Sequence, residues 1–139
     1  MKALNLTEQT KELIKEFLTA MGSRDLEAIA CKFSDKVDWF IAGNEAIAPW
    51  LGQRNNRQEI KEFFQMLWAN VEPVSVNVEH ILADGNFGVI TGEFASRMLR
   101  TGKVYESVFS IHFTVQDNLI VRYRLQEDSY ALVKALENN

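Results

Sequence analysis

Cysteine and proline are scarce in this chain of 139 residues, which holds one cysteine and two prolines. A single cysteine cannot form an internal disulfide bond, so the fold does not depend on an oxidising compartment. No apolar run approaches the ~20 residues that a membrane-spanning helix needs. The opening stretch MKALNLTEQTKELIKEFL is amphipathic and interrupted by charges, unlike a signal peptide. These absences predict a cytoplasmic location.

Positive charge is also in short supply. The 15 Lys and Arg residues are outnumbered by 19 Asp and Glu, which gives a net charge of −4. Affinity for nucleic acid depends on cations that neutralise phosphates, so we expect no nucleic-acid partner. His80 and His112 have no carboxylate or cysteine at ligand spacing, and no phosphate-binding loop or HExxH motif is present. The sequence therefore predicts neither a metal site nor a cofactor.

The stretch from Val37 to Trp68 carries the clearest pattern in the chain. Its first residues alternate between apolar and polar, which predicts a strand over 37–42. A long loop containing Trp50 follows, and a loop of that length is expected to cover or line a site. Asn56 and Glu59 then have the spacing of a capping box, which predicts the start of an amphipathic helix.

Two helices are expected before this stretch and a run of strands after it. Gly22 is expected to be the left-handed stop of the first helix, and Ser23 can cap the second. Asp128 can cap a short helix at the end of the chain. The expected strands, bounded by turn residues, cover 74–82, 87–98, 104–115 and 119–127.

This order of elements indicates an α+β fold rather than the alternation that builds a parallel sheet. The length suits a single domain over residues 1–139. Because the third helix carries so much aromatic mass, we expect the sheet to curl around the helices and leave an apolar cavity.

Four pieces of the sequence carry a joint pattern: AMGSRDLEAIACKFSD, VDWFIAG, WLGQRNNRQEIKEFF and FTVQDNLIVRYRLQEDSYALVKAL. In this order and spacing they resemble the SnoaL-like branch of the nuclear transport factor 2-like superfamily, which also contains ketosteroid isomerase. The resemblance implies a cone-shaped fold with three N-terminal helices packed on a strongly curved, mostly antiparallel sheet, followed by a short C-terminal helix. It also implies a deep pocket and a homodimer built sheet to sheet.

The polar groups of ketosteroid isomerase fall on apolar residues in this comparison. The resemblance places the hydrogen-bonding tyrosine of that enzyme at Phe17 and its general-base aspartate at Ile41. The neutral aspartate of its oxyanion hole falls on or beside Ile111. Steroid isomerisation by that mechanism is therefore not expected.

Glu93 and Arg97 are the predicted catalytic residues. They share one face of the strand over 87–98, and the resemblance places that face inside the cone. A carboxylate in an apolar pocket has a raised pKa, which suits it to acid–base catalysis. Arg97 could hold a carboxylate or enolate oxygen of a substrate. The alternative is structural: a solvated strand glutamate paired with a neighbouring arginine, and an exposed arginine at a strand end.

Further residues are predicted to line the pocket and bind a ligand. Tyrosines on the later strands could donate to a ligand carbonyl, and tryptophans could form an aromatic wall with Trp50 as its lid. Packing in the core is the alternative for each of them. The predicted set is Phe17, Trp39, Ile41, Trp50, Tyr105, Ser107, Phe109, Ile111, Tyr123 and Glu127.

The sequence supports two hypotheses of function. In the first, the protein is a cofactor-free isomerase, a cyclase-type or a hydrolase-like enzyme that acts on a small hydrophobic substrate by proton transfer, with Glu93 as acid or base. In the second, it is a non-catalytic ligand-binding or dimerisation module whose cone is filled by its own side chains. An empty pocket that holds a buried carboxylate with a shifted pKa would favour the first.

Overall fold

The computed structural model describes residues 4–138. In it, helices pack against a six-stranded sheet. The elements are α1 (Leu6–Gly22), α2 (Leu26–Ala30), β1 (Phe33–Ile41), β2 (Gly52–Arg54), α3 (Arg57–Asn70), β3 (Val71–Asp84), β4 (Phe87–Met98), β5 (Val104–Gln116), β6 (Leu119–Glu127) and α4 (Ser129–Leu136). The expected α+β class is confirmed. Within residues 4–138, no helix combines the length and the apolarity that crossing a membrane requires.

Side-chain caps fix where the helices begin. The backbone N–H of Glu59 donates to Asn56 Oδ1 over 2.9 Å, as expected for the start of α3. The Glu59 carboxylate accepts from the N–H of Asn55 at 2.7 Å, one residue earlier than an ideal capping box. Asp128 likewise caps α4 by accepting from the N–H of Ala131 at 2.9 Å. These local signals place both helices where the sequence predicts them.

The start of the second helix differs from the prediction. Asp25, rather than Ser23, is the N-cap of α2, because its carboxylate accepts from the N–H of Ala28 at 3.1 Å. The Ser23 hydroxyl instead donates to carbonyls of the last turn of α1. Both residues can cap a helix. The left-handed residue is Arg24, with φ of 54°, and not Gly22 as predicted, and it turns the chain between Ser23 and Asp25.

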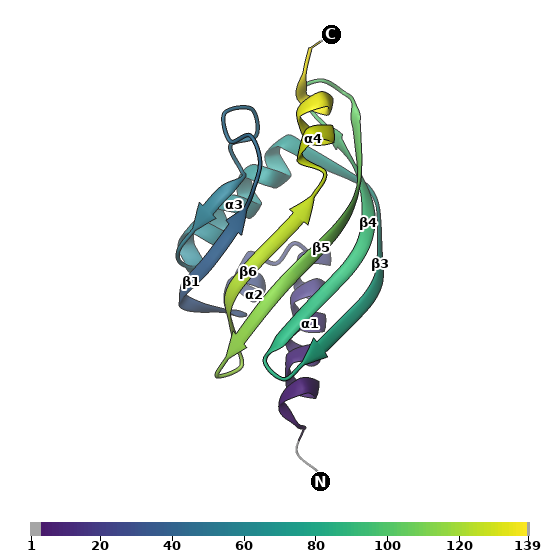
Figure 1. Cartoon of the computed structure of the whole chain (residues 1–139). Coiled ribbons are helices and arrows are strands. Elements are labelled where there is room, and N and C mark those ends of the chain that lie inside the picture. Colours follow the sequence, from purple (N-terminus) through teal and green to yellow (C-terminus); the bar gives the residue numbers. More distant parts are fainter. Residues whose placement is uncertain (1–3, 139) are drawn as a thin grey trace.

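The strands follow the order β2-β1-β6-β5-β4-β3 in an open sheet. β1 and β6 are parallel and the other neighbours are antiparallel, so the expectation of a mostly antiparallel sheet is confirmed. Figure 1 shows the long strands curving over α1, α2 and α3, with α4 at the end of the molecule where β6 stops. The predicted long loop after β1 contains β2, which pairs with the end of β1.

The bend of the long strands has visible local causes. β3 pairs with β4 through two irregularities, one beside Pro73 and one between Val78 and His80. Pro73 is tolerated because β3 is an edge strand, where a missing N–H costs no ladder bond. Gly92 has no side chain where it lies opposite Val78 of β3, and a Cβ there would collide with the Asn77 carbonyl and lie 3.0 Å from the Phe109 ring.

An aromatic core fills the space between α1 and the sheet. Trp39 and Tyr123 stack with ring centroids 3.8 Å apart and an interplanar angle of 7°. Phe17 from α1 meets the Tyr123, Phe33 and Phe113 rings edge to face. Phe17, Phe33, Trp39 and Phe113 are each 0% exposed. This part of the cone is therefore solid, and any cavity has to lie beyond it.

We expect Gly92→Ala to lower the free energy of unfolding by about 1–3 kcal/mol, because the added methyl group overpacks the contact between β4, β3 and Phe109. Urea unfolding followed by circular dichroism measures the change. Gly22→Ala is the control, since it adds the same methyl group at the end of α1, where no described residue other than its chain neighbours and the backbone of its own helix comes within 4 Å. An equal loss of stability in the two variants would contradict the role assigned to Gly92.

Candidate functional site

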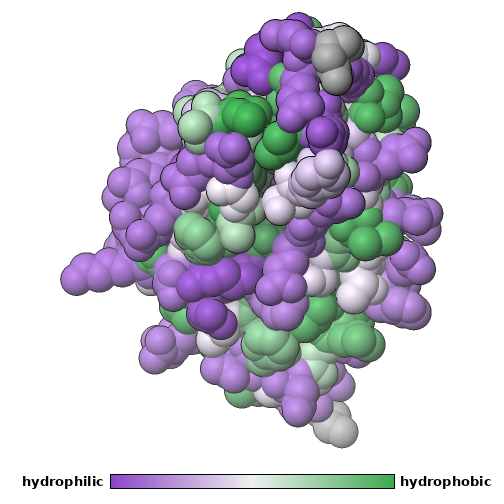
Figure 2. Space-filling model, turned by 45° about the horizontal axis from the view of Figure 1, so that its top comes forward, coloured by the Kyte–Doolittle hydropathy of each residue, from purple (hydrophilic) through white to green (hydrophobic). Residues whose placement is uncertain are grey.

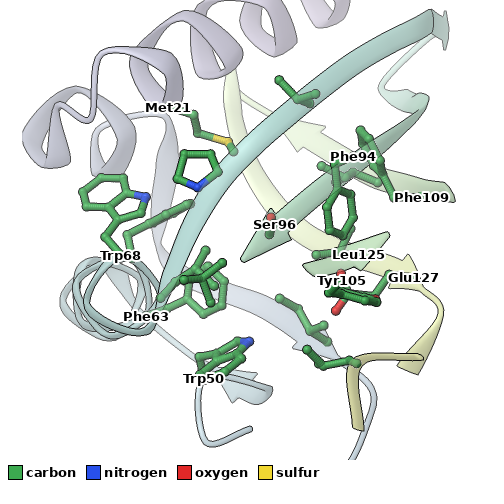
Figure 3. Close-up of a pocket in the computed structure, with 18 of the residues that line it drawn as sticks. Met21, Trp50, Phe63, Trp68, Phe94, Ser96, Tyr105, Phe109, Leu125 and Glu127 are labelled. Atoms are coloured by element: carbon green, nitrogen blue, oxygen red, sulfur yellow. The ribbon is translucent and has the colours of Figure 1, made fainter. Parts of the chain in front are cut away.

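A cavity of about 430 Å³ lies between the helices and the inner face of the sheet. Most of the side chains that line it are aromatic or aliphatic. They come mainly from α1, α3, the strands β3 to β6, and the loop before β2. Figure 3 shows Trp68 and Met21 on one side, Phe94 and Phe109 opposite them, and Trp50 below. The expected apolar pocket is thus present and is not filled by its own aromatic side chains.

Most of the predicted pocket residues line this cavity. Phe17 and Trp39 do not, because both are packed in the aromatic core. Ser107 is buried on the same strand face as Tyr105 but does not line the cavity. Its hydroxyl donates to the Val108 carbonyl at 2.6 Å and accepts from the Asp128 N–H at 2.9 Å. The residues that do line the cavity are Ile41, Trp50, Tyr105, Phe109, Ile111, Tyr123 and Glu127. Their contact with a ligand stays a prediction.

The inward orientation expected for Glu93 and Arg97 is wrong. Both side chains are exposed, and neither lines the cavity. The Arg97 guanidinium lies 3.7 Å from the Glu72 carboxylate and donates to the Gly102 carbonyl at 3.0 Å. The structural alternative, an exposed arginine at a strand end, therefore describes Arg97.

The register between β4 and β5 explains this orientation. Ser96 lies opposite Tyr105, and residues directly opposite each other in an antiparallel pair project from the same face of the sheet. Because Tyr105 faces the cavity, Phe94 and Ser96 face it too, and Glu93 lies on the other face. The turn between β4 and β5 fixes this register, because the Met98 N–H donates to the Lys103 carbonyl at 2.8 Å. Applied to the sequence, that register would have placed Glu93 on the opposite face from Tyr105.

Glu127 is the only carboxylate among the described residues that line the cavity. It stands at the last position of β6, on the same face as Tyr123 and Leu125, which also line the cavity. Burial raises the pKa of Glu127 from 4.5 to about 7. Near neutral pH the carboxyl group therefore exists in both its protonated and its ionised form.

Two tyrosines flank Glu127. Burial first, and the Glu127 charge second, raise the pKa of Tyr105 and of Tyr123 above the ordinary range, so both hydroxyls stay protonated at neutral pH. The Tyr105 hydroxyl donates to the Asp128 backbone carbonyl at 2.9 Å. Figure 3 shows Tyr105 and Glu127 on the same side of the cavity, across from Trp68.

One cation lines the described part of the cavity. Arg24 lies in the turn between α1 and α2, and its guanidinium carbon is 5.1 Å from the centre of the Trp68 ring. Sequence reasoning missed this residue, because its place in the site depends on the left-handed turn that precedes α2 and on the packing of α3 beside it. No local pattern in the sequence indicates either contact.

No set of metal ligands comes together in the part of the chain from 4 to 138, where no three His, Cys, Asp or Glu side chains gather closely enough to hold an ion. His112 lies opposite Arg124 in the sheet, and its Nε2 is 3.2 Å from the Ser110 hydroxyl. The polar groups available for chemistry in the cavity are therefore a carboxyl group, phenols, a guanidinium and hydroxyls.

Comparison with known proteins connects this architecture to a family. A family model described as the SnoaL-like domain matches residues 14–123. An NTF2-like protein from Burkholderia xenovorans LB400 has a TM-score of 0.86 at 21% identity, over 94% of this chain and 98% of that chain. TerC, co-crystallised with polyporic acid, has a TM-score of 0.82 at 20% identity, over 94% and 99%.

An LEH-like epoxide hydrolase from M. tuberculosis is also similar, with a TM-score of 0.72 at 18% identity over 94% of this chain and 90% of that chain. No curated protein matches the sequence. At these identities the similarity shows that the solved structures share the fold of this chain. It does not show that this chain shares their activities.

We expect Glu127→Gln to change the pH dependence of stability. Because the pKa of Glu127 is raised in the folded state, the folded protein loses stability as the pH rises from 4.5 through about 7. Glutamine does not ionise, so the variant should gain up to about 3 kcal/mol relative to wild type between pH 4 and pH 8.5. Urea unfolding at the two pH values measures this gain.

Glu106→Gln is the matched control for this experiment, since Glu106 is exposed on the other face of the sheet, next to Tyr105 in sequence. It should show no comparable gain. A Glu127→Gln variant that differs from wild type by the same free energy at both pH values would contradict the raised pKa.

Proposed function

This chain belongs to the SnoaL-like domain family, and from that premise we propose that it binds a small hydrophobic molecule in the cone and moves a proton on it through Glu127. The observation that carries the proposal is the position of Glu127, a carboxyl group with a pKa of about 7 in a largely apolar cavity. A cavity of about 430 Å³ suits a small-molecule ligand, since such sites typically measure about 300–1,000 Å³.

The proposed reaction is an isomerisation or cyclisation without a cofactor. Ionised Glu127 takes a proton from a carbon next to a carbonyl group, and the electron pair of the broken C–H bond forms an enolate. In an isomerisation, the protonated carboxyl then returns the proton to a different carbon. In a cyclisation, the enolate carbon attacks a second carbonyl carbon of the same molecule, the C=O π electrons move to the oxygen, and the carboxyl gives its proton to that oxygen. A base with a pKa near the working pH is effective in both steps, which is why the raised pKa supports this chemistry.

Stabilisation of the enolate oxygen requires a hydrogen-bond donor in the cavity. Tyr105 and Tyr123 are the candidates, because both remain protonated beside Glu127. Tyr105 already donates to the Asp128 carbonyl, so it would have to exchange this bond for one to the substrate. Tyr123 lines the cavity on the same strand face as Glu127 and is the better placed of the two.

A non-catalytic ligand-binding protein is the second candidate. The engaged hydroxyl of Tyr105 favours it, because an oxyanion hole normally offers donors that are free before the substrate arrives. Apolar Ile41 and Ile111 also line the cavity at positions where the resemblance expects polar groups of an isomerase. TerC, which shares the fold, was co-crystallised with polyporic acid, which supports ligand binding in a cone of this kind.

The homodimer, the absence of a nucleic-acid partner and the cytoplasmic location stay predictions. A sheet-to-sheet dimer would use the face of the sheet that the helices leave uncovered. Val108 on that face is 71% exposed and lies opposite Glu93. Figure 2 shows hydrophobic and hydrophilic side chains interspersed over the visible surface.

The proposed chemistry is tested by exchange of carbon-bound protons. We expect the protein to speed the exchange of the α-protons of 2-tetralone in D₂O, measured by NMR, and Glu127→Gln to reduce this rate by about 10²–10⁴-fold. Glu106→Gln, which alters an exposed carboxylate outside the cavity, should keep the wild-type rate. Full activity in Glu127→Gln would refute the assigned role. Binding of 2-tetralone without any exchange would favour the second candidate.

A further inference from the structure

We propose that the cavity selects apolar ligands that carry one carboxylate, which Arg24 holds where the cone opens to solvent. This inference rests on the proposed function, because it names the class of molecule that the same cavity would bind. Arg24 is exposed and also lines the cavity, so its guanidinium lies at the boundary between the apolar interior and water.

The Arg24 guanidinium makes no hydrogen bond or ion pair with any residue that the structure describes, and its one contact of note is the Trp68 ring. Other arginines have partners. Arg97 and Arg124 pair with carboxylates on the outer face, and Arg100 donates to a backbone carbonyl. The neighbouring Asp25 carboxylate is engaged as the N-cap of α2. The hydrogen-bond donors of Arg24 are therefore available to a ligand.

The backbone geometry indicates that the turn between α1 and α2 does not require an arginine at position 24. Its φ of 54° lies in the left-handed region, which disfavours a residue with a Cβ and which glycine adopts freely. The turn itself is held by backbone bonds, from the Arg24 N–H to the Met21 carbonyl and from the Asp25 N–H to the Ala20 carbonyl, each 3.1 Å long. A charged side chain at a strained position indicates a role for the side chain.

Trp68 orients the charge toward the cavity. Its ring lines the cavity, and the Arg24 guanidinium carbon lies 5.1 Å from the ring centre, within cation–π distance. A guanidinium held on a ring keeps its N–H groups free at its edge, where their fork matches the two oxygens of a carboxylate.

The charges in the cavity favour a monoanion. Arg24 is the only cation and Glu127 the only carboxylate among the described lining residues, so a second negative charge on the ligand would meet no second partner. Figure 3 places Trp68 and Glu127 on opposite sides of the cavity. A ligand whose carboxylate binds Arg24 beside Trp68, and whose reacting carbon lies at Glu127, would therefore span the cavity. Its apolar part would lie between Arg24 and Glu127.

The test compares two ligands of one shape by calorimetry: 4-(1-naphthyl)butanoic acid and its uncharged amide. The wild-type protein should bind the acid about tenfold more tightly, the gain expected of one partly exposed bidentate contact. Arg24→Gly should lose this preference and bind the amide as wild type does, while its thermal midpoint stays equal or rises, because glycine fits the left-handed turn. Arg24→Lys should keep only part of the preference.

Arg122→Gln is the charge-matched control, since Arg122 is exposed and pairs with Asp38 away from the cavity. It should keep the tenfold preference. Equal affinity of wild type for acid and amide would overturn the inference and leave ligand binding in the cone intact. A preference that survives in Arg24→Gly would also overturn it. Failure of both compounds to bind would count against the proposed function and against this inference with it.

Discussion

The bend of the long strands over the helices is the constraint on which the cavity depends. At one end, stacking of Trp39 on Tyr123 and the edge contacts of Phe17 fill the cone completely. Farther along, the irregular pairing of β3 and the missing side chain at Gly92 let the strands turn while Phe109 lies across them. The close-packed aromatic core holds the helices and the sheet together at one end. The curved sheet can therefore be separated from α3 by a cavity at the other end while the fold stays stable.

Two residues of the site are locally unfavourable. Glu127 is buried enough to raise its pKa to about 7, and Arg24 takes up a left-handed backbone that glycine would adopt more easily. The helices of the chain begin at side-chain caps, and its other left-handed turn positions are held by glycine, Asp117 or Asn118, residue types that tolerate this backbone. Such exceptions gather at functional sites, because a fold tolerates them only where something else is gained.

Local patterns were enough to predict the helices and the strands other than β2, since caps, turn residues and apolar periodicity all act within a few residues. β2 lies in the stretch predicted as a long loop. The inward face of β4 could not be read in the same way. Alternation defines two faces without saying which is inside, and the choice depends on the register with β5 across the Met98 to Lys103 turn. The same alternation placed Glu127 in the pocket, but its burial, with no charged partner among residues 4–138, is a property of the assembled fold.

The resemblance directs attention to the interior of the cone, yet the ionisable groups of this cavity lie elsewhere. Ile41 and Ile111, in the positions that the resemblance links to catalysis, line the cavity as apolar side chains. Glu127 stands where β6 ends, and Arg24 where α1 gives way to α2. Ends of elements can change residue type without disturbing the core, since their side chains make fewer packing contacts. One fold can therefore serve different reactions by carrying its polar groups at different positions around the cavity while the sheet and the aromatic core stay the same.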